Sequence, residues 1–324
     1  MAETLKEQLA VHEIAPSEFL SQSPPGRMGN SLPIAYGDCT MGVAAAAACA
    51  TVPASYYLFS LVGHYLGPGR PDMRMRCTVN STRTTKILAT RRVEVKQTSP
   101  DGTSRVCMEL IADFHIEEPA AFIYSAPPRR KYSGPEVIPD LENLSKTLLS
   151  NGRISQRQAE MASATGMFGL MGKFFETRHP IEGVAGQNMF GIAKHIPTDQ
   201  DSLHITDKTS AEWIKTLAPL ETRAEKMSAL AFELDDALSF TPMAHSGLWF
   251  EDVGVASTLD FAMRLFVPDV DLSHWHLRER NTLAAAVGRQ YSESRMWDQE
   301  RALVASMTQQ SILRSKSKLL KSSI

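Results

Sequence analysis

Two stretches of this chain show the same order of predicted elements, and this repeat limits the fold more than any other feature. In each stretch, one helix-forming segment precedes four strand-forming segments. Corresponding strands lie about 195 residues apart, although the two stretches share few identical residues. One helix followed by an antiparallel series of strands, twice over, predicts an α+β fold with a duplicated unit in which each sheet wraps around a long helix.

The first stretch begins with a helix of small residues, predicted from Gly37 to about Thr51 and closed by Pro53. Its four predicted strands cover residues 58–66, 73–82, 87–98 and 105–117. The last strand is the clearest, because apolar and polar side chains alternate along most of it. Such alternation predicts a sheet with one buried face and one polar face.

The second stretch repeats this order, with a helix predicted over about 219–240. Its strands are predicted at residues 255–266, 274–282, 284–296 and 301–313. Between the stretches, several prolines predict a surface linker that contains a short helix near 141–149, and a strand resumes around 171–177. We therefore expect three parts: an N-terminal unit (1–120), a linker (121–170) and a C-terminal unit (171–324).

The charge balance excludes several partners. Lys plus Arg (34) nearly equal Asp plus Glu (36), so no global charge favours nucleic acid or an anionic membrane. No apolar run approaches the roughly 18 residues of a membrane-spanning helix.

The four cysteines form no CxxC pair, and His274 and His276 lack an evident third ligand, so we expect neither a metal nor another cofactor.

The targeting signals favour the cytoplasm as the default location. The first residues are acidic, unlike the basic start of a signal peptide. Ser317-Lys318-Leu319 resembles a peroxisomal address, but five residues follow it and such signals are recognised at the terminus. A peroxisomal location therefore stays an alternative without a terminal signal.

Short motifs in both stretches resemble one known family. In the first stretch they are Ala35-Tyr36-Gly37, Tyr65-Leu66-Gly67-Pro68-Gly69 and Thr90-Arg91-Arg92-Val93 with Gln97 beyond it. In the second they are Ala256-Ser257-Thr258-Leu259-Asp260 and the segment from Leu303 to Gln309, followed by Arg314. In this order, they resemble the acyl-CoA thioesterase II family, whose members are fused double hotdogs.

The resemblance implies an activity and a site. Family positions fall on Asp235, Thr258 and Gln309, which would hold a water beside the thioester carbonyl, so that hydrolysis needs no covalent acyl-enzyme. A carboxylate can activate water while a hydroxyl and an amide orient it. The implied substrate is an acyl-CoA thioester. A helix amide near Gly42 is a candidate oxyanion donor. Since double hotdogs often pair further, the resemblance also suggests a homodimer.

Local patterns give these three residues unequal support. A helical projection places Asp235 at the flank of an apolar stripe and Asp236 on the opposite, solvated side; an ordinary surface acid is the alternative for Asp235. Strand alternation places Gln309 on an apolar face, where its amide needs partners from a site or from backbone. Alternation places Thr258 on the face opposite Leu259 and Phe261, so an ordinary strand threonine competes with the functional interpretation.

Departures from the family pattern keep other functions open. Phe261 stands where the family usually has a histidine, and Gly67 stands where it has an arginine. We therefore predict hydrolysis of an acyl thioester, and retain two alternatives. One is a dehydratase, cyclase or isomerase acting on a pathway-specific acyl or polyketide substrate. The other is an acyl-binding protein without catalysis. Chain length, pathway and physiological substrate do not follow from the sequence.

Overall fold

A single antiparallel sheet of twelve strands spans both halves of the chain in a computed structural model, which describes residues 2–29, 32–163 and 168–315. The strand order is β1-β2-β4-β5-β6-β3-β9-β12-β11-β10-β8-β7. The halves join where β3 pairs with β9, with Gly63 opposite Phe261. This is the duplicated α+β arrangement that the repeat predicts, and the prediction is confirmed. Ser317-Lys318-Leu319 lies outside the described residues.

The strands of the first half are β1 (Val11–Ala15), β2 (Glu18–Ser21), β3 (Tyr56–Tyr65), β4 (Arg76–Thr84), β5 (Leu88–Thr98) and β6 (Ser104–Ile116). Those of the second half are β7 (Phe175–Arg178), β8 (Ser210–Thr216), β9 (Val253–Leu265), β10 (His276–Ala286), β11 (Arg289–Trp297) and β12 (Leu303–Ser315). All eight predicted strands of the two repeats are present, with ends shifted by a few residues. The sequence patterns missed β1, β2 and β8, which are short and lack a clear alternation.

The α-helices are α1 (Leu5–Leu9), α2 (Gly37–Cys49), α3 (Leu141–Ser150), α4 (Gln156–Met161), α5 (Gly169–Phe174), α6 (Val184–Asn188), α7 (Arg223–Asp235) and α8 (Thr241–His245). Short 3₁₀ turns are η1 (Pro135–Val137), η2 (Met189–Gly191), η3 (Ile205–Asp207) and η4 (Leu238–Phe240). None of the helices in the described ranges is long and apolar enough to cross a membrane.

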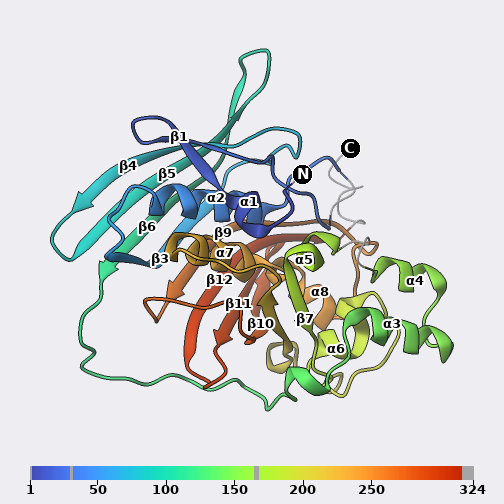
Figure 1. Cartoon of the computed structure of the whole chain (residues 1–324). Coiled ribbons are helices and arrows are strands. Elements are labelled where there is room, and N and C mark those ends of the chain that lie inside the picture. Colours follow the sequence, from blue (N-terminus) through green and yellow to red (C-terminus); the bar gives the residue numbers. More distant parts are fainter. Residues whose placement is uncertain (1, 30–31, 164–167, 316–324) are drawn as a thin grey trace.

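Helices α2 and α7 lie side by side on one face of the sheet (Figure 1). They run antiparallel, so the start of α2 meets the end of α7. Gly42 marks their close approach, since a Cβ there would lie 2.8 Å from a methyl of Leu9 and 3.1 Å from the carbonyl oxygen of Ser228. Gly42 also lies in the second turn, where the helix occupies its N–H. The Gly42 amide itself is therefore not free to donate to an oxyanion, and an oxyanion donor from the first turn of α2 stays a prediction.

Helix α7 is shorter than predicted, because local residues fix where it begins and where it ends. At its start, Thr222 and Glu225 form a reciprocal capping box. At its end, Asp236 leaves the helical conformation (ψ 132°) and Ala237 is left-handed (φ 61°). Every residue from Met227 to Asp235 is buried, so this part of α7 has no solvent face.

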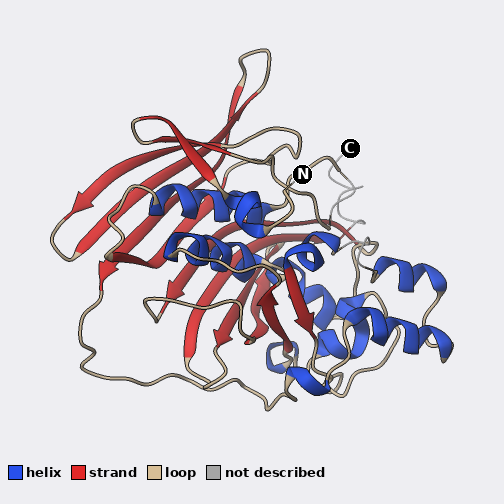
Figure 2. Cartoon of the chain, in the orientation of Figure 1, coloured by secondary structure: helices blue, strands red, loops and turns tan. Residues whose placement is uncertain are grey.

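The segment between the repeats covers the second half of the sheet. The ring N–H of Trp297 donates to the Ala126 carbonyl at 2.8 Å, and the Tyr132 hydroxyl donates to Glu279 at 2.6 Å. The predicted linker helix is present as α3, but residues 169–174 form α5 where a strand is predicted, and only then does β7 begin. Figure 2 shows α3, α4 and α6 gathered beside the second half of the sheet, away from the α2–α7 pair.

Candidate functional site

The carboxylate of Asp235 lies at the point where the two halves meet. Asp235 is the last residue of α7 and is 6% exposed. The amide of Gln309, on β12, donates to its Oδ1, and the hydroxyl of Tyr65, on β3, donates to its Oδ2 at 2.7 Å. Hydrogen bonds to a carboxylate favour its charged form. Burial acts more strongly in the opposite direction and raises the pKa of Asp235.

Gln309 lies on the inner face of β12, where its alternation places it. It is 1% exposed, and besides the bond to Asp235 its Oε1 accepts a hydrogen bond from the Ser311 hydroxyl at 3.3 Å. The amide is therefore bonded to side chains rather than to backbone. Asp235 and Gln309, separated by 74 residues in the chain, are in direct contact.

Thr258 lies on the Gln309 face of the sheet, and the prediction of the opposite face is wrong. The register between β9 and β12 pairs Gln310 with Asp260 and then Ser311 with Thr258, skipping Leu259. This β-bulge inserts one residue into β9 and reverses the alternation beyond it. Residues directly opposite in an antiparallel pair share a face, so Thr258 lies beside Ser311, the neighbour of Gln309. Within the described ranges, the Thr258 hydroxyl forms no hydrogen bond.

A second carboxyl group, Asp38, faces Asp235. It lies in the first turn of α2, is 3% exposed, and is within hydrogen-bonding contact of Asp235. Burial, followed by the charges of Asp235 and Asp236, raises its pKa well above the ordinary value. Sequence reasoning missed Asp38 and Tyr65. An acid among the small residues of α2 was a signal, but only the antiparallel packing of α2 and α7 places it at the site.

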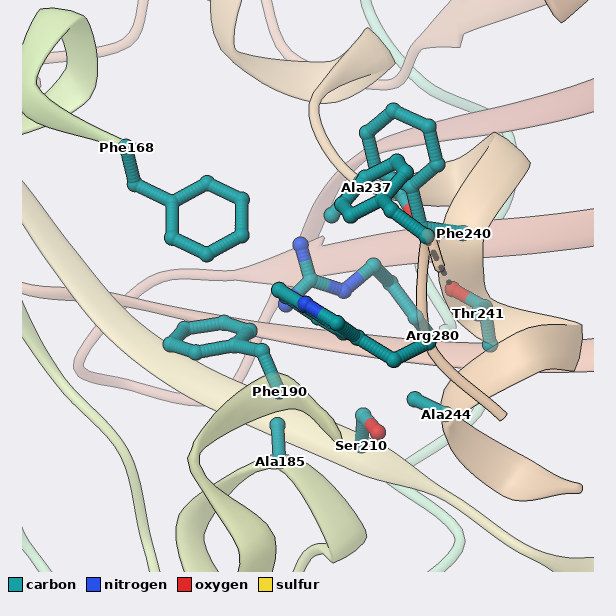
Figure 3. A pocket seen from close by; sticks show the side chains of 11 residues that line it. Phe168, Ala185, Phe190, Ser210, Ala237, Phe240, Thr241, Ala244 and Arg280 are labelled. Atoms are coloured by element: carbon teal, nitrogen blue, oxygen red, sulfur yellow. Dashed lines mark hydrogen bonds between the residues drawn. The ribbon is translucent and has the colours of Figure 1, made fainter. Parts of the chain in front are cut away.

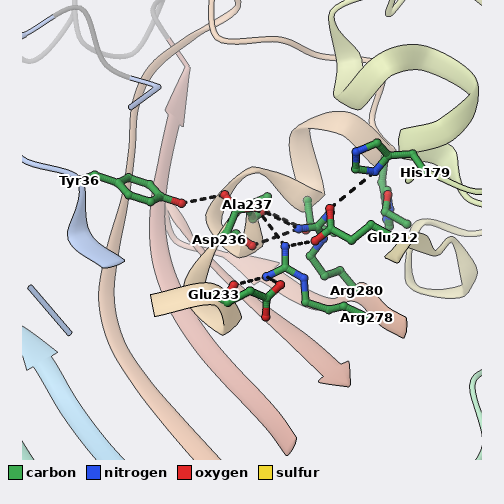
Figure 4. Close-up of polar contacts among 11 residues, drawn as sticks. Tyr36, His179, Glu212, Glu233, Asp236, Ala237, Arg278 and Arg280 are labelled. Carbon is green, nitrogen blue, oxygen red and sulfur yellow. Dashed lines mark hydrogen bonds and ion pairs between the residues drawn. The ribbon is translucent and has the colours of Figure 1, made fainter. Parts of the chain in front are cut away.

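Asp236 is buried, and the prediction of a solvated side chain is wrong. It caps α7 outside the helical conformation, so the helical projection does not apply to it. Its Oδ1 accepts from the Tyr36 hydroxyl at 2.7 Å and its Oδ2 accepts from Arg278 at 3.0 Å (Figure 4). Asp235 and Asp236 therefore point into two different polar environments.

Arg278 is the centre of a buried ion network. Its side chain is fully buried and pairs with Glu212, Glu233 and Asp236, while Arg280 pairs with Glu212 at 3.3 Å (Figure 4). Despite burial, the two arginines lower the pKa of Glu212 to about 2. Burial raises the pKa of Glu233 to about 8. The positive charge of Arg278 acts in the opposite direction, and the negative charges of Glu212 and Asp236 act in the same direction as burial. The network anchors the end of α7 to β10 and β8.

An aromatic pocket begins next to this network (Figure 3). Arg280 contributes a polar side chain to its wall, and Ala237, two residues after Asp235 in the sequence, also lines it. The aromatic residues that line it are Phe168, Phe190, Phe240, Trp249 and Phe250. Its free volume is about 20 Å³, which is about the space of one water molecule.

Within residues 2–29, 32–163 and 168–315, no group of three or more His, Cys, Asp or Glu side chains is arranged to hold a metal ion. Asp235 and Asp236 have tyrosine, glutamine and arginine donors around them.

Known proteins match this chain over both halves. Residues 24–115 match the family described as acyl-CoA thioesterase N-terminal domain, and residues 175–313 match the acyl-CoA thioesterase C-terminal domain. No curated protein sequence matches the chain significantly.

Three solved structures show how far the fold is shared. The acyl-CoA thioesterase II TesB2 of Mycobacterium marinum is 19% identical with a TM-score of 0.67, over 97% of this chain and 99% of that one. The tesB protein of Mycobacterium avium subsp. paratuberculosis is 16% identical with a TM-score of 0.67, over 95% and 97%. A hot dog fold protein of unknown function from Alicyclobacillus acidocaldarius is 12% identical with a TM-score of 0.64, over 96% and 98%. With both domain families matched in order and the double-hotdog fold present, this chain belongs to the acyl-CoA thioesterase family.

Proposed function

We propose that this protein hydrolyses acyl-CoA thioesters, or thioesters of a related acyl carrier, using a water held by Asp235, Gln309 and Thr258. The observation that carries the proposal is the contact between Asp235 and Gln309, two polar side chains that both lie in the core. A buried carboxylate held by an amide and a phenol has a fixed direction, which general-base catalysis requires.

The reaction follows from this arrangement. Asp235 accepts a proton as the water oxygen attacks the thioester carbonyl carbon, and a tetrahedral oxyanion forms. The C–S bond then breaks, and the departing thiolate takes the proton. The products are a carboxylic acid and a free thiol, and Asp235 returns to its starting charge. Gln309 and Thr258 would orient the water, since Gln309 bonds to Asp235 and Thr258 lies on the Gln309 face of the sheet, opposite Ser311.

The surroundings of Asp235, which include Phe261, favour hydrolysis over dehydration. Phe261 lies opposite Gln309 in the β9–β12 pair, is 1% exposed, and packs against the Tyr65 ring at 5.8 Å between centroids. Among the described residues, the side chains that hydrogen bond to Asp235 are Tyr65, Gln309 and Asp38, and none of them is an imidazole. The site thus presents a carboxylate base in an apolar wall rather than a histidine–carboxylate pair.

The test is thiol release from a panel of short, medium and long acyl-CoAs by the purified protein and by Asp235→Asn. We expect the wild type to release thiol and the variant to lose at least about 100-fold in kcat, within the range of general-base contributions. Asp72→Asn is the matched control, because Asp72 lies in a solvent-exposed pair with Arg70. It should behave as the wild type.

Other results would identify the alternatives. A product that differs from the substrate by one water, with the thioester intact, would establish a dehydratase. Tight acyl-CoA binding without turnover in both proteins would establish a binding protein. Equal turnover by the wild type and Asp235→Asn would leave hydrolysis in place and remove Asp235 from it.

A further inference from the structure

Asp38 brings a second acid to the site from the other half of the chain. It lies in the first turn of α2, and Asp235 is the last residue of α7. Because the two helices are antiparallel, these positions face one another. Both carboxyls are nearly inaccessible, with exposed fractions of 3% and 6%.

The hydrogen-bond donors are distributed unequally between the two carboxyls. Asp235 accepts from Gln309 on one oxygen and from Tyr65 on the other. Asp38 is also near the Tyr36 hydroxyl, but that hydroxyl has one proton and donates it to Asp236 at 2.7 Å. Within the part of the chain that the structure describes, the Oδ2 atom of Asp38 is buried and has no hydrogen-bond partner. A buried oxygen without a partner is unfavourable as a charged acceptor, but it becomes a donor once it carries a proton. A protonated Asp38 beside an ionised Asp235 gives each carboxyl a partner.

The surrounding charges also favour a protonated Asp38 and an ionised Asp235. Two ionised carboxylates in contact repel each other strongly in a buried site, and one of them retains a proton. Asp236 adds further negative charge beside Asp38. The start of α2 favours a charged Asp38 and the end of α7 disfavours a charged Asp235. Two direct hydrogen bonds to Asp235 outweigh these helix ends, because charge-assisted bonds are the stronger effect.

We propose that Asp38 and Asp235 hold one proton between them, with Asp38 as a positioning residue that donates it to Asp235. The structural part rests on the contact and on the unpartnered Asp38 oxygen. The catalytic consequence rests on the proposed hydrolysis. When Asp235 takes the proton of the attacking water, the pair carries two protons, and it returns one to the thiolate. Loss of the Asp38 proton at alkaline pH places two charges in the pair and ends activity.

Other titratable groups surround the pair. Tyr65 approaches from β3, Tyr36 and Cys39 from the start of α2, and Asp236 from the end of α7. Burial raises the pKa of both tyrosines well above the ordinary value and that of the Cys39 thiol to about 12. These three groups therefore stay neutral up to pH 9. Asp236 is compensated by Arg278 at 3.0 Å.

The decisive test is urea unfolding of the wild type and Asp38→Asn between pH 4 and pH 9, which needs no substrate. Asparagine keeps a donor and cannot ionise. The Asp38 pKa is raised in the folded state, so its contribution to stability is complete below the unfolded value of 3.8 and is lost as pH rises through the folded value. Relative to Asp38→Asn, the folding equilibrium constant of the wild type should fall by up to about tenfold per pH unit within that window.

Two further variants complete the test. Asp38→Ser also keeps a donor without a charge and serves if the asparagine variant does not fold. Asp72→Asn, in a solvent-exposed pair, should follow the wild type above pH 5. Parallel pH dependence in the wild type and both Asp38 variants would overturn the shared proton.

The pH profile of kcat/KM tests the role of Asp38 in catalysis. We expect the wild type to lose up to about tenfold in activity per pH unit once Asp38 gives up its proton, whereas Asp38→Asn, which cannot ionise, should show no such decline. Identical alkaline profiles would overturn the catalytic role. If neither protein hydrolyses any acyl-CoA while the unfolding curves still diverge, the shared proton stands and the proposed hydrolysis fails.

Discussion

The hydroxyl of Tyr65 donates a 2.7 Å hydrogen bond to Oδ2 of Asp235, so the first half of the chain supplies a direct partner for the carboxylate of the second half. The contact spans 170 residues of sequence and lies where β3 and β9 join the two sheets. The carboxylate of Asp235 in the second half is therefore held in part by a side chain of the first half.

Tyr65→Phe tests this bond. Loss of one hydrogen bond to a charged group costs about 1.5–3 kcal/mol, so kcat should fall by roughly 10- to 100-fold. The ring keeps its contact with Phe261, so the variant should still fold, with its free energy of unfolding lowered by about the same 1.5–3 kcal/mol. Tyr124→Phe is the control, because Tyr124 is 91% exposed. An unchanged kcat in Tyr65→Phe would show that Gln309 alone holds the carboxylate.

Thr258→Val tests the β-bulge. Valine keeps the branched shape and the strand preference of threonine but removes the hydroxyl. If the bulge directs Thr258 toward the Gln309 face, kcat should fall by about tenfold, the effect of one hydrogen bond of roughly 1.4 kcal/mol. Ser257→Ala, at the neighbouring exposed position, should leave thiol release unchanged. A loss in the serine variant but not the threonine variant would mean that the strand faces are reversed.

Arg278→Ala tests the buried network. The substitution leaves Glu212, Glu233 and Asp236 without their shared cation, and breaking a buried ion pair from one side typically costs about 3–5 kcal/mol. Urea unfolding should show this loss. Arg295→Ala removes a partly exposed arginine paired with Glu293 and should cost less than about 1 kcal/mol. Similar losses in the two variants would mean that the network contributes little.

Glu233→Gln tests the pH dependence of the same network. Burial raises the folded pKa of Glu233 to about 8, above its ordinary value of 4.5. Its contribution to stability is therefore complete below pH 4.5 and is lost as pH rises to about 8. Relative to Glu233→Gln, the wild type should unfold at progressively lower temperature over this range. Glu142→Gln, in an exposed pair, is the control; a constant offset between the wild type and Glu233→Gln would refute the shift.

The sequence by itself determined the repeat and the strand patterns. Side-chain alternation and helix periodicity are local properties, so the eight repeated strands and the α2 and α7 helices could be predicted from them. The position of Gln309 on an apolar face is also local, and it correctly indicated an amide in need of partners. The short strands β1, β2 and β8 have too few residues for a period to show.

Only the tertiary structure decided which polar groups meet. Thr258 lies on the face opposite to the predicted one because the β9–β12 register skips Leu259. Such a bulge depends on the partner strand rather than on the bulged sequence. Asp236 became buried because α7 ends one residue earlier and Arg278, from β10, lies beside it. Asp38 reached Asp235 through the antiparallel packing of two helices nearly 200 residues apart. Such contacts are set by packing between distant segments, and periodicity along one segment carries no information about its partner.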